Sequence, residues 1–186
     1  MGTRTVYRLL NNVIGRGVIM LEDINGYNEK LVEKLKKKKL HISSAESCTG
    51  GLFSAYLTAV PGASDVFSET IVTYSNEAKM RELGVRAQTL ESVGAVSPET
   101  ASEMARGIRH RTGADIGIGI TGIAGPGGGT PEKPVGTVYI SVNSEKGERT
   151  ELLKSEASDR DGIRRDTCIL AFRMALDMAD MYDDIP

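Results

Sequence analysis

A run of alternating isoleucine and glycine, Ile116-Gly117-Ile118-Gly119-Ile120, constrains the fold of this 186-residue chain more than any other stretch. Successive side chains of a strand point to opposite faces, so the isoleucines share one face and the glycines share the other. The isoleucine face is therefore packed, and the bare glycine face lets a helix or a ligand approach the backbone closely. The run predicts a strand over 115–120 and leaves open which of these two neighbours it has.

The order of the other elements predicts a layered fold. Hydrophobic spacing, caps and breakers predict helices over 27–39, 51–59, 76–83, 98–112 and 159–182, and further strands within 40–46, 66–74, 135–142 and 148–154. Strands alternate with helices early in the chain, and a hairpin around Lys146-Gly147 comes late. This order favours an α/β fold: a three-layer α/β/α sandwich with a mixed sheet, in a single domain.

The N-terminal residues differ in character from the rest of the chain. Met20 could be a translation start, so we expect residues 1–19 to be an N-terminal extension and residues 20–186 to form the domain. The alternative is a genuine N-terminal helix, because apolar residues recur there at helical spacing: Val6, Leu9, Leu10 and Val13. Limited proteolysis that leaves residues 1–19 intact would favour the helix.

Composition narrows the class of protein. Apolar residues make up 40% and charged residues 26% of the chain, which is typical of a globular protein in water. The net charge of −2 gives no basic field for nucleic acid, and no apolar run approaches the roughly 20 residues that cross a bilayer. Cys48 and Cys168 cannot build a disulfide framework and no signal peptide is visible, so we expect a cytoplasmic protein without nucleic-acid or membrane partners. His41 and His110 stand apart from any metal-binding spacing, so no metal is expected.

The stretch around Ser47 is the first candidate site. A short strand ends there, hydroxyls and a thiol follow, and two glycines open a helix. Because a helix N-terminus has unpaired N–H groups and a positive dipole, Ser47 or Thr49 would lie beside a field that favours negative charge. Gly50 and Gly51 would let a ligand approach the backbone. The plain alternative is a helix cap without a substrate, and Cys48 is a rival nucleophile because thiolates are intrinsically better ones.

A second candidate group joins a strand to the next helix. Tyr74 ends the strand, and Lys79 lies one turn into the helix. A partly buried lysine that loses its proton can act as general base toward a serine, and a tyrosine can relay or donate a proton. The plain alternative is a solvated lysine on a helix face. Ser47 and Lys79 lie far apart in sequence, so only the fold can bring them together.

Residues 117–122 match the G-x-G-x-x-G pattern, but their context differs from that of a dinucleotide-binding loop. The glycines lie within the strand pattern, and Pro126 and further glycines follow in place of a helix. Thr121 and the loop through residue 129 can instead offer N–H groups to an anion. Arg160 and Arg164 open the last helix, where guanidinium groups either suit a phosphate or pair with neighbouring carboxylates on an ordinary surface.

Together these segments resemble the C-terminal domain of the competence/damage-inducible CinA family and its stand-alone form, nicotinamide-nucleotide amidase. The resemblance covers about residues 28–180. It rests on ordered motifs at matching separations: Ala45-Glu46-Ser47-Cys48-Thr49-Gly50-Gly51, Val60-Pro61-Gly62, Val72-Thr73-Tyr74-Ser75-Asn76-Glu77-Ala78-Lys79, Gly94-Ala95-Val96-Ser97, Thr121-Gly122-Ile123-Ala124-Gly125-Pro126 and Lys133-Pro134-Val135-Gly136-Thr137-Val138. It implies an α/β/α fold without a metal or other cofactor. The larger CinA proteins carry an additional N-terminal domain, whose activity is not transferred to this chain.

The resemblance also implies an activity, the hydrolysis of the carboxamide of nicotinamide mononucleotide to nicotinic acid mononucleotide and ammonia. It implies Ser47 as the nucleophile, Lys79 as its base and Tyr74 as an assisting group. The implied substrate-binding residues are Thr49, Gly50 and Gly51 at the helix start, Thr121, Gly122 and Gly125 in the glycine loop, and Arg160 and Arg164 near the phosphate. The alternatives are a nucleotide-binding or regulatory module without turnover and a hydrolase of another small amide. A small-molecule nucleotide is the expected partner, and a homo-oligomer stays open.

Overall fold

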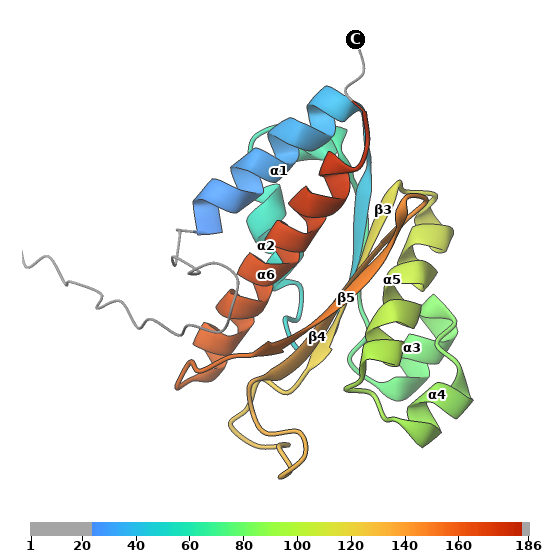
Figure 1. Ribbon diagram of the computed structural model, residues 1–186, viewed down its shortest axis with the longest axis vertical. Helices are drawn as coiled ribbons and strands as arrows, with labels where there is room; N and C mark the ends of the chain where they lie inside the picture. The colour runs from blue at the N-terminus through green and yellow to red at the C-terminus, as the bar shows by residue number, and fades with distance from the viewer. Residues whose placement is uncertain (1–23, 184–186) are drawn as a thin grey trace, which may run out of the picture.

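The computed structural model describes residues 24–183, whose helices and strands are labelled in Figure 1. The helices are α1 (Ile24–Lys38), α2 (Leu52–Thr58), α3 (Asn76–Leu83), α4 (Ala87–Ser92), α5 (Pro98–Thr112) and α6 (Arg160–Asp180), with a 3-10 turn, η1 (Ala63–Asp65). The strands are β1 (Ile42–Glu46), β2 (Phe67–Val72), β3 (Ile116–Gly122), β4 (Thr137–Ser144) and β5 (Gly147–Lys154). The predicted N-terminal extension, residues 1–19, lies outside the described residues.

The described residues form one mixed sheet with the strand order β2-β1-β3-β4-β5. Strands β2, β1 and β3 are parallel, whereas β4 and β5 are antiparallel and form the late hairpin. Figure 1 shows α1, α2 and α6 over one face of the sheet and α3, α4 and α5 over the other. The α/β/α sandwich with a mixed sheet is therefore confirmed.

Helix α5 covers the glycine face of β3. A Cβ atom on Gly117 would lie 2.3 Å from the carbonyl oxygen of Ala105, and one on Gly119 would lie 2.2 Å from the carbonyl oxygen of Ala101. No side chain fits at such distances, so these glycines permit the close approach of α5 to the sheet. The isoleucine face packs into the larger core, which α1, α2 and α6 share. Of the two neighbours that the sequence left open, the helix is the one present.

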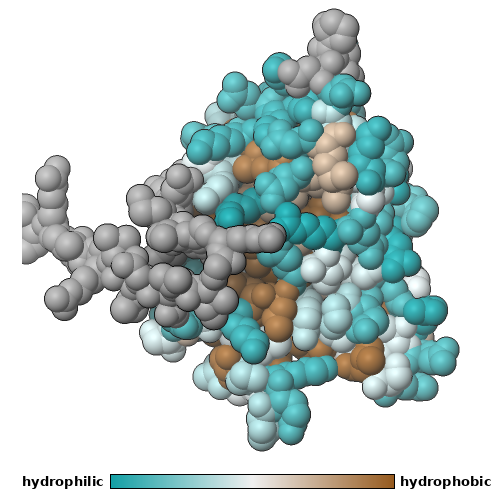
Figure 2. Space-filling model, in the orientation of Figure 1, coloured by the Kyte–Doolittle hydropathy of each residue, from teal (hydrophilic) through white to brown (hydrophobic). Residues whose placement is uncertain are grey.

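The predicted elements differ from the structure mainly at their ends. The helix predicted over 27–39 runs from Ile24 to Lys38, and α4 was not predicted at all. Helix α4 has six residues, and Arg86 at its N-cap makes no side-chain capping bond, so it lacks the usual start signal. Hydrophilic residues cover most of the face shown in Figure 2, with hydrophobic residues in separate patches. Within residues 24–183 no helix is both long enough and apolar enough to cross a membrane.

Candidate active site

Three parallel strands end side by side, and this places the candidate residues. The register pairs Glu46, the last residue of β1, with Val72 at the end of β2 and with Ile120 near the end of β3. The carboxyl ends of the three strands therefore meet at one edge of the sheet, where Ser47 follows β1 and Thr121 lies near the end of β3. The carboxyl edge of parallel strands is where α/β proteins commonly bind their ligands.

Ser47 lies within hydrogen-bonding distance of Lys79. The distance from Lys79 Nζ to Ser47 Oγ is 3.1 Å, and Nζ also donates to the carbonyl oxygen of Thr73 at 2.7 Å. Helix α3 begins just before Lys79, where the Ser75 hydroxyl caps it by accepting the N–H of Ala78 at 3.1 Å. The fold thus brings together a hydroxyl and an amine that are 32 positions apart in the chain.

Burial changes the chemistry of Lys79. The residue is 2% exposed, and none of the ion pairs between described residues includes it. Desolvation lowers the pKa of its ammonium group, and the nearby Cys48 opposes this with a smaller effect. A lysine with a lowered pKa is more readily neutral than an ordinary one, so Lys79 can accept the proton of the Ser47 hydroxyl.

A fully buried carboxylate, Glu46, holds the loop that carries Ser47. Its oxygens accept the N–H groups of Gly51, Phe53 and Ser54 at 2.9, 3.2 and 3.0 Å. These charge-assisted hydrogen bonds and the positive end of the α2 dipole stabilise the carboxylate without a basic side chain. The N-terminus of α2 is therefore occupied by the protein's own acid.

The geometry does not support an anion-binding role for the helix start. Thr49, Gly50 and Gly51 are absent from the cleft lining beside Ser47. The N–H of Gly50 donates to the carbonyl oxygen of Ser47 at 3.0 Å, and that of Gly51 donates to the buried carboxylate. Among hydrogen bonds that join different described residues, none has the Cys48 N–H as its donor. Cys48 follows Ser47 and lines the cleft, so its N–H lies beside the nucleophile, where it also contacts its own thiol.

The cleft beside Ser47 has a volume of about 280 Å³. It is lined by Ser47, Cys48, Tyr74, Asn76, Lys79, Ala95, Val96, Thr121, Gly122, Ile123, Ala124, Gly125, Gly127, Gly128 and Arg160. This set contains all three predicted catalytic residues and four of the predicted binding residues, Thr121, Gly122, Gly125 and Arg160. Arg164 and the three residues of the helix start lie outside it.

Arg160 connects two sides of the cleft. Its Nη2 donates to the hydroxyl of Tyr74 at 2.8 Å, and its Nη1 donates to the carbonyl oxygen of Gly125 at 2.6 Å. The side chains of Arg160 and Tyr74 are exposed to solvent. An arginine has more N–H donors than these two bonds use, so Arg160 can still bind an anion in the cleft.

Two predicted binding residues direct their polar groups to the protein itself. Arg164 donates from Nε and Nη2 to the carbonyl oxygen of Thr49, at 3.2 and 2.7 Å, and its Nη1 pairs with Asp161 at 3.1 Å. It anchors α6 to the loop after β1, a geometry that does not support phosphate binding. The Thr121 hydroxyl donates to the carbonyl oxygen of Ala95 at 2.7 Å, so it joins two walls of the cleft.

Cys48, the rival nucleophile, is a buried thiol. Burial raises its pKa to about 12, because desolvation disfavours the thiolate. The thiolate is the nucleophilic form, so burial disfavours Cys48 as a nucleophile near neutral pH. The geometry therefore favours Ser47 over Cys48.

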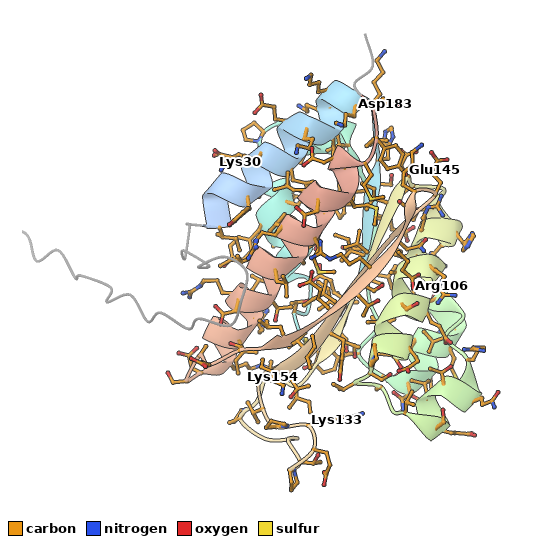
Figure 3. All side chains as sticks on the ribbon, in the orientation of Figure 1. Lys30, Arg106, Lys133, Glu145, Lys154 and Asp183 are labelled. Atoms are coloured by element: carbon orange, nitrogen blue, oxygen red, sulfur yellow. The ribbon has the colours of Figure 1, made fainter. Side chains whose placement is uncertain are left out.

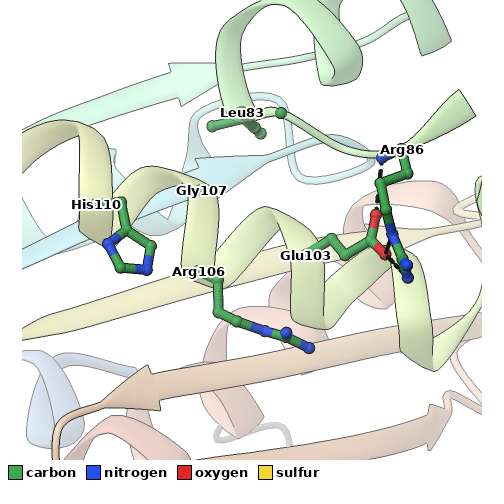
Figure 4. A pocket seen from close by; sticks show the side chains of 7 residues that line it. Leu83, Arg86, Glu103, Arg106, Gly107 and His110 are labelled. Carbon is green, nitrogen blue, oxygen red and sulfur yellow. Dashed lines mark hydrogen bonds and ion pairs between the residues drawn. The ribbon is translucent and has the colours of Figure 1, made fainter.

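A larger hollow, of about 490 Å³, lies between the end of α3 and helix α5 and is called the α3–α5 groove (Figure 4). It is lined by Leu83, Gly84, Arg86, Glu103, Arg106, Gly107 and His110. Arg86 donates from Nε to Glu103 at 2.7 Å, and Arg106 pairs with Glu148 at 2.9 Å, so its charges are neutralised in pairs. The groove has no hydroxyl or thiol in its lining. In the part of the chain that the structure describes, no cluster of histidine, cysteine and carboxylate side chains could hold a metal ion.

Sequence reasoning assigned no role to several residues that the structure places at the site. Asn76, Ala95 and Val96 line the cleft. Glu46 holds the loop that carries Ser47 by accepting the N–H of Gly51. An acid at the end of a predicted strand, with only a short loop before the next helix, was a usable signal for Glu46. Asn76 and the 95–96 segment carry no local signal, because only the fold shows which loop faces Ser47.

Comparison with known proteins places the chain in a family. The model of the CinA C-terminal domain matches residues 24–179. A putative competence-damage inducible protein of Clostridium acetobutylicum is 58% identical over 135 residues, which are 73% of this chain and 31% of the relative. One of Acetivibrio thermocellus is 47% identical over 178 residues, which are 93% of this chain and 42% of the relative. The chain thus spans less than half the length of these relatives.

Solved structures agree in fold along almost their whole length. The competence/damage inducible protein CihA of Agrobacterium tumefaciens has 39% identity and a TM-score of 0.81, covering 86% of this chain and 98% of that one. A CinA superfamily protein of Escherichia coli has 32% identity and a TM-score of 0.81, covering 87% and 95%. The chain therefore belongs to the CinA C-terminal domain family.

Proposed function

We propose that this chain is an amidohydrolase that converts nicotinamide mononucleotide to nicotinic acid mononucleotide and ammonia. The observation that carries the proposal is the buried Lys79 amine 3.1 Å from the Ser47 hydroxyl. A serine beside a lysine of lowered pKa is an activated nucleophile. The choice of substrate rests on the resemblance of the chain's motifs to those of nicotinamide-nucleotide amidases.

The first half of the reaction forms an ester with Ser47. Neutral Lys79 takes the hydroxyl proton while Oγ attacks the carboxamide carbon, and the carbonyl electron pair moves onto its oxygen. The N–H of Cys48 donates to this oxyanion. Lys79, now an ammonium ion, gives its proton to the amide nitrogen, so the C–N bond breaks and ammonia leaves.

The second half releases the acid. Water attacks the ester carbon, Lys79 takes a proton from that water, and the bond from the carbon to Ser47 Oγ breaks. Lys79 then returns the proton to Oγ, which restores the starting pair. One water is consumed, and the carboxamide leaves as a carboxylic acid and ammonia.

Different lining residues bind the phosphate and the ring. Arg160 holds the phosphate with the N–H groups that its bonds to Tyr74 and Gly125 do not use. Ala95 and Val96 provide an apolar wall that suits a flat pyridine ring. Tyr74, held by Arg160, assists at the cleft rim.

Ammonia release from nicotinamide mononucleotide by wild type and Ser47→Ala tests the function. We expect the variant to lose at least about 10³-fold in kcat/KM while the nucleotide still raises its Tm, because the nucleophile is lost and the cleft is kept. Ser64→Ala, at an exposed serine in η1, is the control and keeps wild-type turnover. Wild type that binds the nucleotide without releasing ammonia would instead support a nucleotide-binding module, and release from other amides alone would support a different amidase.

A further inference from the structure

Lys133 joins two loops that form the cleft. Lys133 is labelled in Figure 3 and lies in the loop between β3 and β4. Its Nζ donates to the carbonyl oxygens of Val93 and Val96 at 2.8 and 2.7 Å. None of the ion pairs between described residues includes Lys133. The ammonium therefore gives charge-assisted hydrogen bonds to two carbonyls of another loop, and such bonds are stronger than neutral ones.

The segment that receives these bonds depends on side chains for its shape. It connects α4 to α5, and the carbonyl oxygens of all four residues from 93 to 96 accept hydrogen bonds from side chains. Ser97 and Thr100 donate to the oxygen of Gly94 at 3.0 and 2.9 Å, and Thr121 donates to that of Ala95 at 2.7 Å. The other two oxygens bond to Lys133. Half of the accepting carbonyls therefore depend on one lysine.

The base of the lysine is itself positioned. The N–H of Thr130 donates to the carbonyl oxygen of Lys133 at 2.9 Å, and the Thr130 hydroxyl accepts the N–H of Lys133 at 3.1 Å. This turn aims the side chain at the 93–96 segment, which contributes Ala95 and Val96 to the cleft wall. The glycine loop, which includes Gly125, forms another part of the lining.

We propose that Lys133 is a positioning residue that sets the distance between these two walls, and so the affinity of the cleft for a flat aromatic amide. The proposal rests on the proposed function for its substrate. Lys133 is absent from the cleft lining, so it acts through the wall and not on the reacting atoms. Ser47 and Lys79 belong to other elements, so loss of Lys133 changes binding more than chemistry.

Kinetics of Lys133→Met with nicotinamide mononucleotide give the first test. We expect KM to rise about tenfold or more while kcat stays within about threefold, and Lys133→Arg to recover most of the loss, because a guanidinium can also donate to two carbonyls. The control is Lys154→Met, an exposed lysine on β5 that Figure 3 also labels, with an unchanged KM. An unchanged KM in Lys133→Met overturns the proposal. A fall of kcat by the same factor as the rise of KM also overturns it.

Hydrogen exchange of the free protein gives a second test that needs no turnover. Lys133→Met should raise deuterium uptake in peptides covering 93–97 and leave β1 and α6 at wild-type uptake. If wild type releases no ammonia, the proposed function is wrong. Hydrogen exchange then still tests the role of Lys133, because it does not depend on turnover. Unchanged exchange over 93–97 overturns it, and so does a rise over the whole chain.

Discussion

Two hollows formed by the described residues differ in how their charged side chains are paired. The α3–α5 groove is the larger, at about 490 Å³, and its arginines pair with Glu103 and Glu148 near the surface. The cleft at the carboxyl edge is smaller, at about 280 Å³, and it contains a buried lysine whose hydrogen-bond partners are a hydroxyl and a carbonyl. Burying an amine without a carboxylate is unfavourable for stability. Such an arrangement marks a functional site better than cavity size does.

Among the substitutions that test this comparison, removal of the buried amine should have the largest effect on turnover. We expect Lys79→Met to lower kcat/KM about 10³-fold, the usual range for loss of a general base, and to keep a folded protein. Ammonia release measures the first and circular dichroism the second. Near-normal turnover in this variant would contradict the assignment of Lys79 as base.

The same variant should also differ from wild type in how its thermal stability depends on pH. Below the lowered pKa of Lys79 both folded and unfolded wild type carry its proton, and between that pKa and 10.5 only the unfolded chain does. Wild type therefore gains stability as pH rises through this window, whereas Lys79→Met does not. The Tm of the variant relative to wild type should fall steadily toward pH 10.5. A Tm difference that does not change with pH would show that the amine is not desolvated.

Removing the guanidinium from the cleft should have an intermediate effect. We expect Arg160→Gln to raise KM about tenfold with kcat within about threefold, because in the proposed reaction Arg160 binds the phosphate and not the reacting carboxamide. Arg164→Gln is the contrast, since its guanidinium already bonds to Thr49 and lines no part of the cleft. An equal rise of KM in both variants would mean that α6 matters as a whole and that no phosphate contact is lost.

Changing the buried thiol should have a small effect. Cys48→Ala should keep kcat/KM within about threefold, because the thiol keeps its proton and the N–H of residue 48 is retained. Iodoacetamide treatment of wild type provides a check by a different route. Activity lost both by alkylation and by substitution would make Cys48 the nucleophile.

The groove should respond least. His110→Gln should keep kcat and KM within about twofold, because His110 lines the groove and is absent from the cleft. Steady-state kinetics are sufficient to measure this. A tenfold change would mean that the two hollows are coupled and that the groove has a part in the reaction.

The fold was largely predictable because its signals are local. Alternation over 116–120 predicted a close neighbour for β3, and the structure supplies α5 at that face. The helix predicted over 98–112 is α5, and the hairpin predicted around Lys146-Gly147 is formed by β4 and β5. Helix α4 escaped prediction because it is short and has no side-chain cap.

The site was less predictable because its contacts are not local. Residue types indicated Ser47 and Lys79, but each segment alone also fitted a plain cap or a solvated lysine, and the family resemblance was needed to pair them. Glu46 takes the helix N–H groups that sequence reasoning had offered to a substrate. Lys133 was quoted within a motif, yet nothing local shows that its side chain reaches Val93 and Val96.

The rate at which a serine-directed fluorophosphonate labels the protein tests the central claim most directly, because it reports the nucleophile without assuming a substrate. We predict that peptide mass spectrometry finds the label on Ser47, and that Lys79→Met is labelled at least about 100-fold more slowly. The wild-type labelling rate should rise with pH to a midpoint below 10.5, the ordinary value for lysine. A label on another residue, or equal rates in wild type and Lys79→Met, would contradict the serine–lysine pair.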